Sequence, residues 1–196
     1  MEEILANYII EIKAILTEAR LQAYKAINTA MVEAYWKIGQ RIVLEEQNGK
    51  ERAEYGKEII KSLSVALTAE FGKGFSKRSL WEMRQFYILF SDYQKVRTLF
   101  AQLSWSHFQR VIKVQDEKAR TYYLTEAAQN MWSVRTLDRN ISTLYYNRLI
   151  ASQEKELVVQ EMKEKTANLQ ITEFIKNPTV LEFLNLPTNL SYTETE

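Results

Sequence analysis

The sequence predicts an all-α protein, and two observations support this expectation. Only 5 glycines and 2 prolines occur among the 196 residues, and both prolines, Pro178 and Pro187, lie near the end of the chain. A chain with so few helix breakers is biased towards long helices. Apolar residues also recur every three or four positions over most segments, which is the period of an amphipathic helix, whereas strand-like alternation is nowhere convincing.

The first expected helix covers residues 4 to 47, as one long helix or as two helices in line. Asn48 and Gly49 are expected to end it, because both residues tolerate the left-handed conformation that commonly follows a helix. Its apolar residues have helical spacing: Leu5, Ile9, Ile12, Leu16, Ala19, Ala23, Ile27, Ala30, Ala34, Ile38 and Ile42.

A helix-turn-helix pattern follows over residues 54 to 90. One helix is expected over 54 to 71 and a second over 77 to 90, where Ser76 can act as the N-cap. The glycine-containing segment 72 to 75 forms the turn between them. In motifs of this kind the second helix enters the major groove of DNA.

Further short helices are expected after this motif. Residues 91 to 103 form a loop or, as the alternative, a small β-hairpin that would make the unit winged-helix-like. Ser104 then caps a short helix over 105 to 113, and Asp116 caps another that runs to about Asn130.

The last part of the chain changes in character near residue 151. Ser133 is expected to cap a helix whose apolar face is made of Val134, Leu137, Ile141, Leu144 and Leu149. We therefore assign residues 1 to 150 to the main helical domain and 151 to 196 to an appended segment. Within that segment, 153 to 168 form a Glu- and Lys-rich exposed helix, and 171 to 186 hold a short apolar cluster.

Charge is distributed unevenly along the chain, although the formal net charge is only +1. Residues 50 to 113 carry 12 lysines and arginines against 6 acidic residues, whereas residues 151 to 196 carry 4 against 8. A basic segment is the electrostatic feature expected of a phosphate-binding surface. This basic segment includes the helix-turn-helix pattern.

One face of the helix over 77 to 90 carries the residues that we expect to contact DNA: Lys77, Arg78, Trp81, Arg84 and Gln85. Arginine and lysine can reach phosphates or guanine edges, and glutamine can pair with adenine. Lys73, in the turn, is expected to face the phosphate backbone. A solvated helix face with ordinary charges is the alternative. Trp81 either stacks on bases or packs, and the other tryptophans are assigned to packing: Trp36, Trp105 and Trp132.

The composition argues against several chemistries. The chain has no cysteine, which excludes disulfides and thiolate metal sites, and its single histidine, His107, excludes a His-rich metal site. His107 has no evident nucleophile and acid as partners, so we expect it to cap, hydrogen-bond or pack at the start of its helix, with phosphate contact as an alternative. We expect no catalytic residue, no metal and no cofactor.

Membrane and secretory segments are not expected. No stretch approaches ~20 uncharged apolar residues, the length that a membrane-spanning helix needs. The first 15 residues lack the basic start and unbroken apolar run of a signal peptide. We therefore expect a cytoplasmic protein.

Six short runs are distinctive when they are taken together: Ala34-Tyr35-Trp36-Lys37-Ile38-Gly39, Glu54-Tyr55-Gly56-Lys57, Glu70-Phe71-Gly72-Lys73-Gly74-Phe75-Ser76, Met83-Arg84-Gln85-Phe86-Tyr87, Leu103-Ser104-Trp105-Ser106-His107-Phe108 and Trp132-Ser133-Val134-Arg135. In this order and spacing the chain resembles the N-terminal domain of the YhcG-like proteins of bacteria, a domain of unknown function, over about residues 8 to 184. The resemblance implies a helical, winged-helix-like domain that binds DNA.

The same resemblance implies a PD-(D/E)XK nuclease domain after this one in full-length members, and the chain ends where we expect that domain to begin. The tripeptides that fit the nuclease's acid-x-Lys pattern lie in expected helices, without a supporting strand: Glu11-Ile12-Lys13, Asp116-Glu117-Lys118 and Glu161-Met162-Lys163. We therefore expect a non-catalytic DNA-binding module that targets a nuclease, with DNA, a nuclease partner or a second copy of the chain as partners. The alternative is a protein-assembly module using the long first helix and the tail, which predicts an exposed apolar patch.

Overall fold

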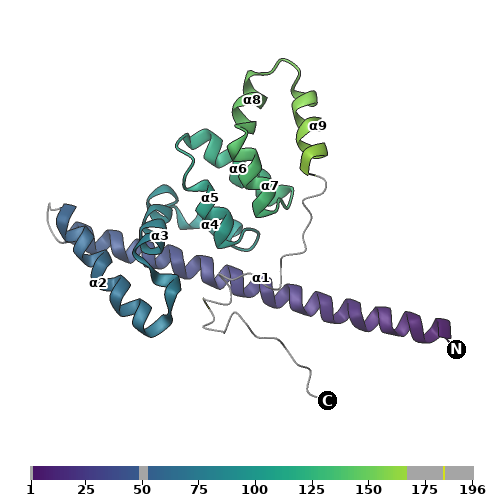
Figure 1. The fold of residues 1–196 in the computed structure, drawn as a ribbon, viewed down its shortest axis with the longest axis horizontal. Helices are drawn as coiled ribbons and strands as arrows, with labels where there is room; N and C mark the ends of the chain where they lie inside the picture. Colours follow the sequence, from purple (N-terminus) through teal and green to yellow (C-terminus); the bar gives the residue numbers. More distant parts are fainter. Residues whose placement is uncertain (1, 49–52, 167–182, 184–196) are drawn as a thin grey trace.

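The computed structural model describes residues 2–48, 53–166 and 183, and in this part of the chain all regular elements are helices. The all-α expectation is therefore confirmed. Figure 1 shows one long helix, α1, running along the whole molecule, with α2 on one side of it and α4 to α9 on the other. Among the helices that the structure describes, none is both long and apolar enough to cross a membrane.

The first helix, α1, runs without interruption over Glu2–Asn48, so the choice between one helix and two in line is settled in favour of one. It is followed by α2 over Ala53–Phe71, a short 3₁₀ helix, η1, over Lys73–Phe75, and α3 over Lys77–Leu89. These bounds agree with the predicted pair of helices and the turn between them.

Close packing of α3 across α1 depends on a glycine. A Cβ atom placed on Gly39 of α1 would lie 2.1 Å from the carbonyl oxygen of Met83 in α3. Since any side chain at this position would collide with backbone, the sequence can bring the two helices this close only with glycine. Trp36, one turn earlier, donates its indole N–H to the carbonyl of Phe90 at 2.7 Å, just beyond the end of α3.

The hairpin wing considered for residues 91 to 103 is wrong, because Tyr93–Phe100 form a helix, α4. Asp92 starts it: one carboxylate oxygen accepts hydrogen bonds from the backbone N–H groups of Gln94 and Lys95, at 3.1 and 3.3 Å. Val96 and Phe100, one turn apart, then point into the core. An N-cap and a helical apolar period explain the helix, and both were present in the sequence.

The second half of the chain forms five helices in the described residues: α5 (Trp105–Val111), α6 (Glu117–Gln129), α7 (Val134–Ser142), α8 (Tyr145–Ala151) and α9 (Lys155–Thr166). The single helix expected from Ser133 to Leu149 is therefore wrong. It breaks at Leu144, which adopts a left-handed conformation with φ of 51°. Tyr123 of α6 stabilises this break through two hydrogen bonds. Its hydroxyl accepts one from the backbone N–H of Tyr146 and donates the other to the carbonyl of Asn140, both at 3.1 Å.

The core is aromatic and joins the two halves of the chain. Phe86 of α3 lies at its centre, with ring centroids 4.7 Å from Phe108 and 5.5 Å from Trp105, both in α5. Trp36, Trp105 and Trp132 are all buried, which confirms their assignment to packing. The helix α9 contacts α8 and is half-buried at Val158 and Met162, so it is less exposed than expected. The apolar cluster predicted over 171 to 186 lies outside the described residues, apart from Phe183, whose ring meets Tyr35.

Candidate nucleic-acid interface

The exposed face of α3 is set by what its other face buries. Ser76 caps the helix by accepting a hydrogen bond from the N–H of Ser79 at 3.2 Å. From there Leu80, Met83 and Phe86 are fully buried. Three predicted contact residues remain on the outside, as the helical period requires: Lys77, Arg78 and Trp81, of which Trp81 is 40 % exposed.

The turn before α3 holds Lys73 outward next to this face. Gly72 has a backbone φ of 88°, a conformation that residues other than glycine rarely adopt. Its N–H bonds the carbonyl of Thr68 at 3.1 Å and so closes the end of α2. Lys73 and Lys77 are both exposed and make no ion pair within the described part of the chain. Both ammonium groups are therefore available to an anion.

Arg78 is exposed but partly neutralised. Its guanidinium lies 3.2 Å from Glu82 one turn later, and its side chain is 79 % exposed. The Glu82 side chain is only 14 % exposed, so a phosphate would have to compete with this carboxylate for the Arg78 guanidinium. Glu82 itself is held from α5, where Gln109 donates to it at 2.7 Å.

Arg84 differs from Lys77 in that its guanidinium is already bound within the molecule. Its Nε lies 2.9 and 2.7 Å from the two carboxylate oxygens of Glu46 in α1, and both side chains are mostly buried. Its guanidinium also lies 5.0 Å from the ring centroid of Trp81, within cation–π range. Arg84 therefore orients Trp81 and ties α3 to α1. Gln85 is half-buried and makes no side-chain hydrogen bond with any residue that the structure describes.

The structure thus brings together four of the six predicted residues as an outward group, Lys73, Lys77, Arg78 and Trp81, which we call the α3 face. Sequence reasoning missed Glu46 and Glu82, the two acids that border this face. Glu82 is one helical turn from Arg78, a spacing at which ion pairs form, so the sequence contained that signal. Glu46 lies 38 residues before Arg84, and no local pattern indicates that pairing.

His107 has a structural role at the start of α5. Its Nδ1 accepts from the backbone N–H of Ser104 at 3.2 Å, and Ser104 provides the reciprocal cap, so the two residues form a capping box. Its Nε2 lies 2.9 Å from the carbonyl oxygen of Trp132, which can only accept, so Nε2 carries the proton. Burial lowers the pKa of His107, against a smaller opposing effect of the Trp132 carbonyl.

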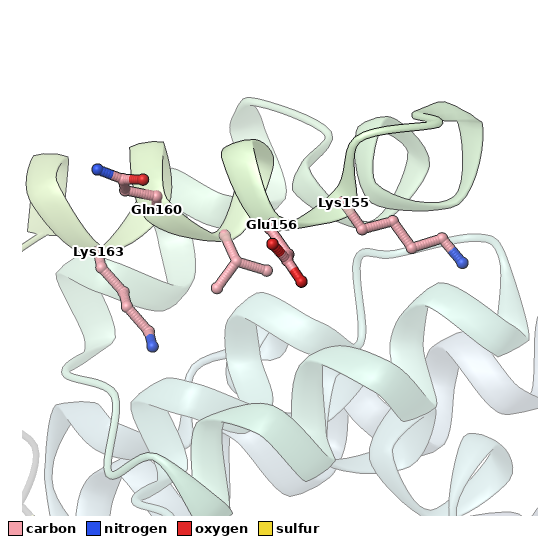
Figure 2. A pocket seen from close by; sticks show the side chains of 5 residues that line it. Lys155, Glu156, Gln160 and Lys163 are labelled. Atoms are coloured by element: carbon pink, nitrogen blue, oxygen red, sulfur yellow. The ribbon is translucent and has the colours of Figure 1, made fainter.

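In the part of the chain that the structure describes, the surface hollows contain no ligand set for a metal ion. Among the described residues, no three His, Cys, Asp or Glu side chains cluster in a way that could hold a metal ion. Figure 2 shows a shallow hollow on α9 with Lys155 and Lys163 at its ends and one acid, Glu156, between them. A second hollow, between α6, α8 and α9, is lined largely by aromatic and apolar side chains, among them Tyr122, Trp132, Tyr145 and Met162.

Comparison with known proteins identifies the family to which this chain belongs. The model of the DUF1016 N-terminal domain matches residues 11–148. The Escherichia coli (strain K12) protein named "Putative nuclease YhcG" is 30% identical over 211 aligned residues, which cover 93% of this chain and 56% of that protein. The chain therefore spans about half the length of this relative. No solved structure is significantly similar.

Proposed function

Because the chain belongs to the DUF1016 N-terminal domain family, we propose that it is a DNA-binding module that brings a nuclease to duplex or branched DNA. The observation that carries this proposal is the α3 face. Lys73 of η1 and Lys77 and Arg78 of α3 are exposed beside Trp81, and the opposite side of α3 is buried in the core. Phosphates need such outward cations, and a rigid support fixes their spacing.

In this proposal α2, η1 and α3 act as a helix-turn-helix. Lys73 contacts the backbone from the turn, and Lys77 and Arg78 contact phosphates or base edges from the first turn of α3. Recognition helices present their N-terminal residues to the groove, and these two residues are the first two of α3. Gln85, in the third turn of α3, is the candidate for pairing with adenine.

Arg84 and Trp81 have a supporting role in this proposal. The ion pair with Glu46 keeps the Arg84 guanidinium against the indole, so Trp81 stays in one orientation at the surface. A tryptophan held in this way can lie against a sugar or an unstacked base without losing side-chain entropy on binding. Removal of Glu46 would free Arg84 and loosen Trp81 together.

The link to nuclease activity comes from the relative. That protein is named as a putative nuclease, and this chain matches 56% of its length. We propose that residues 1 to 150 supply the DNA-binding part and that residues 151 to 196 lead towards the nuclease. The catalytic residues would come from a nuclease domain or partner protein outside the 196 residues of this chain.

The test is binding of a labelled duplex at several salt concentrations. Each phosphate contact makes the logarithm of affinity fall by ~0.9 per unit of the logarithm of salt concentration. The triple variant Lys73→Gln/Lys77→Gln/Arg78→Gln is expected to bind at least ~10-fold more weakly, with a slope shallower by up to ~3.

A charge-matched control distinguishes a DNA-binding site on the α3 face from a general electrostatic attraction of the protein to DNA. Lys118, Lys155 and Lys163 are exposed on α6 and α9 and make no ion pair in the described structure. Their triple glutamine variant removes the same charge away from α3, and its affinity and slope should stay close to those of the wild type. No binding by the wild type at low salt, or an equal loss in both variants, would contradict the proposal.

A further inference from the structure

The N-terminal half of α1 exposes an unusual amount of apolar surface. Every residue from 7 to 20 is exposed. Six large apolar residues lie within nine positions there, with exposed fractions from 39 to 67 %: Tyr8, Ile9, Ile10, Ile12, Ile15 and Leu16. In Figure 1 this part of α1 extends beyond all the other labelled helices. A concentrated apolar surface of this kind marks an interaction site in a water-soluble helix.

Part of this apolar surface follows a heptad repeat. Residues at alternating spacings of four and three form a continuous seam: Leu5, Ile9, Ile12, Leu16, Ala19, Ala23, Ala26 and Ala30. Tyr8 and Ile15 flank this seam, and Ile10 lies outside it. Such spacing lets a straight seam on one helix pack against the same seam on another. The next two seam positions hold charged residues, Glu33 and Lys37, whose side chains form an ion pair at 2.7 Å. The seam therefore ends where α1 joins the folded body.

The seam and the body use different sides of α1. Met31, Val32, Tyr35 and Trp36 face the body and are buried. At about 100° per residue, these positions lie on the side of the helix opposite Ala23, Ala26 and Ala30. All three alanines are exposed. A second helix can therefore lie along the seam without displacing α3 or α4.

We propose that the occupant of this seam is a second copy of the same chain, in a parallel coiled coil. The seam is complementary to itself, and the charges beside it favour the parallel orientation. Lys13 and Arg20 occupy the e positions beside the seam, and Tyr8 and Ile15 occupy the g positions on its other side. In a parallel pair the e positions of one helix meet the g positions of its partner, so the aliphatic stems of Lys13 and Arg20 would cover the exposed Tyr8 and Ile15. An antiparallel pair would instead bring the basic e positions of the two helices together.

The first test measures mass against concentration by sedimentation equilibrium on the full chain. The wild type is expected to pass from one to two copies as the concentration rises. Ile12→Glu, within the seam, should raise the dissociation constant at least ~10-fold, because a buried charge cannot be paired there. Ile10→Glu is the matched control: it changes the same residue type on the same helix, outside the seam, and should dimerise like the wild type.

Both variants lie outside the folded core, so their far-ultraviolet circular dichroism at low concentration should match that of the wild type. A wild type that stays monomeric at every concentration would overturn the proposal. So would an equal effect of Ile10→Glu and Ile12→Glu, or a mass that fits another oligomer.

The second test reports orientation, using the absence of cysteine from the sequence. Ala26→Cys places one thiol at the seam, and in a parallel pair the two Cα atoms would lie at about the 6 Å that a disulfide spans. Mild oxidation should therefore give a covalent dimer. In an antiparallel pair with the seams aligned from Leu5 to Ala30, residue 26 would lie opposite residue 9, so the two thiols would be ~25 Å apart along the axis and would not join. Ala14→Cys, which faces away from the seam, should stay uncrosslinked, and crosslinking by both variants or by neither would refute the parallel pair.

Discussion

His107 shows how a single residue can connect elements that lie far apart in the sequence. It completes the cap of α5 with Ser104 and donates to the carbonyl of Trp132, just before α7. The cap requires an unprotonated Nδ1, because protonation would place an N–H there facing the N–H of Ser104, whereas the bond from Nε2 to Trp132 would remain. Burial also favours the neutral ring, because it lowers the pKa of His107.

The folded protein should therefore lose stability as the pH falls below the unfolded histidine pKa of about 6.5. The unfolded chain binds a proton in that range and the folded chain resists it, so stability is complete above this pH and is lost on acidification. Urea unfolding at pH 7.5 and 5.5 measures the change. His107→Gln should be less stable than the wild type at pH 7.5, by about 1–2 kcal/mol through the lost cap and hydrogen bonds. Its stability should change less between the two pH values, and an equal change in both proteins would contradict this role.

Single residues of the α3 face were only partly predictable. Lys77, Arg78 and Trp81 lie outward because helical spacing decides which face of α3 is buried, and spacing can be seen in the sequence. Lys73 lies outward because of the turn that follows Gly72. Arg84 has the same spacing but is turned towards Glu46. That pairing depends on how α1 crosses α3, a tertiary fact that local patterns do not contain.

At the scale of elements, four helix starts with a capping residue were predicted, whereas α4, capped by Asp92, and the break between α7 and α8 were not. Ser76, Ser104, Asp116 and Ser133 each precede a helix as expected. The break between α7 and α8 occurs at Leu144, whose left-handed conformation is uncommon for leucine. The fixing contact comes from Tyr123 of α6, so tertiary packing and not local sequence ends α7.

The crossing of α1 and α3 can be tested at Gly39. Gly39→Ala places a methyl group 2.1 Å from the backbone oxygen of Met83, so the helices must separate. Alanine favours helix by up to ~1 kcal/mol over glycine, but overpacking costs about 1–3 kcal/mol, and we expect net destabilisation. Thermal and urea unfolding measure it.

Gly56→Ala in α2 is the control for helix propensity. Its nearest contact is the carboxylate of Glu46, at 2.9 Å, which is a side chain and not backbone, so a small shift of Glu46 that keeps its pair with Arg84 can relieve the contact. The variant should therefore lose less stability than Gly39→Ala. If Gly39→Ala were equally tolerated, the close approach of α1 and α3 would not depend on glycine.

At the scale of the whole molecule, α1 joins the two proposed activities. Its C-terminal half supports α3 and holds Arg84 through Glu46, while its N-terminal half carries the apolar seam. A parallel pair would place both bodies, and therefore both α3 faces, at the same end of the coiled coil. Proteins with paired recognition helices bind two half-sites on one duplex, so dimerisation would raise affinity for DNA with two sites suitably spaced.

This division of α1 predicts two kinds of amide hydrogen exchange along one helix. Residues 7 to 20 have no tertiary packing in the described monomer, and helices of this length are marginal alone in water, so their amides should exchange rapidly in dilute solution. Their protection should rise by about tenfold or more at concentrations that favour the dimer, because opening then requires dissociation. Residues 31 to 42 include buried positions against the body, and their protection should not change with concentration. Mass-spectrometric exchange at two concentrations measures both regions, and Ile12→Glu should remove the concentration dependence only in the first. Strong protection of residues 7 to 20 in dilute solution would mean that another part of the same chain covers the seam, and it would contradict a second copy as the occupant.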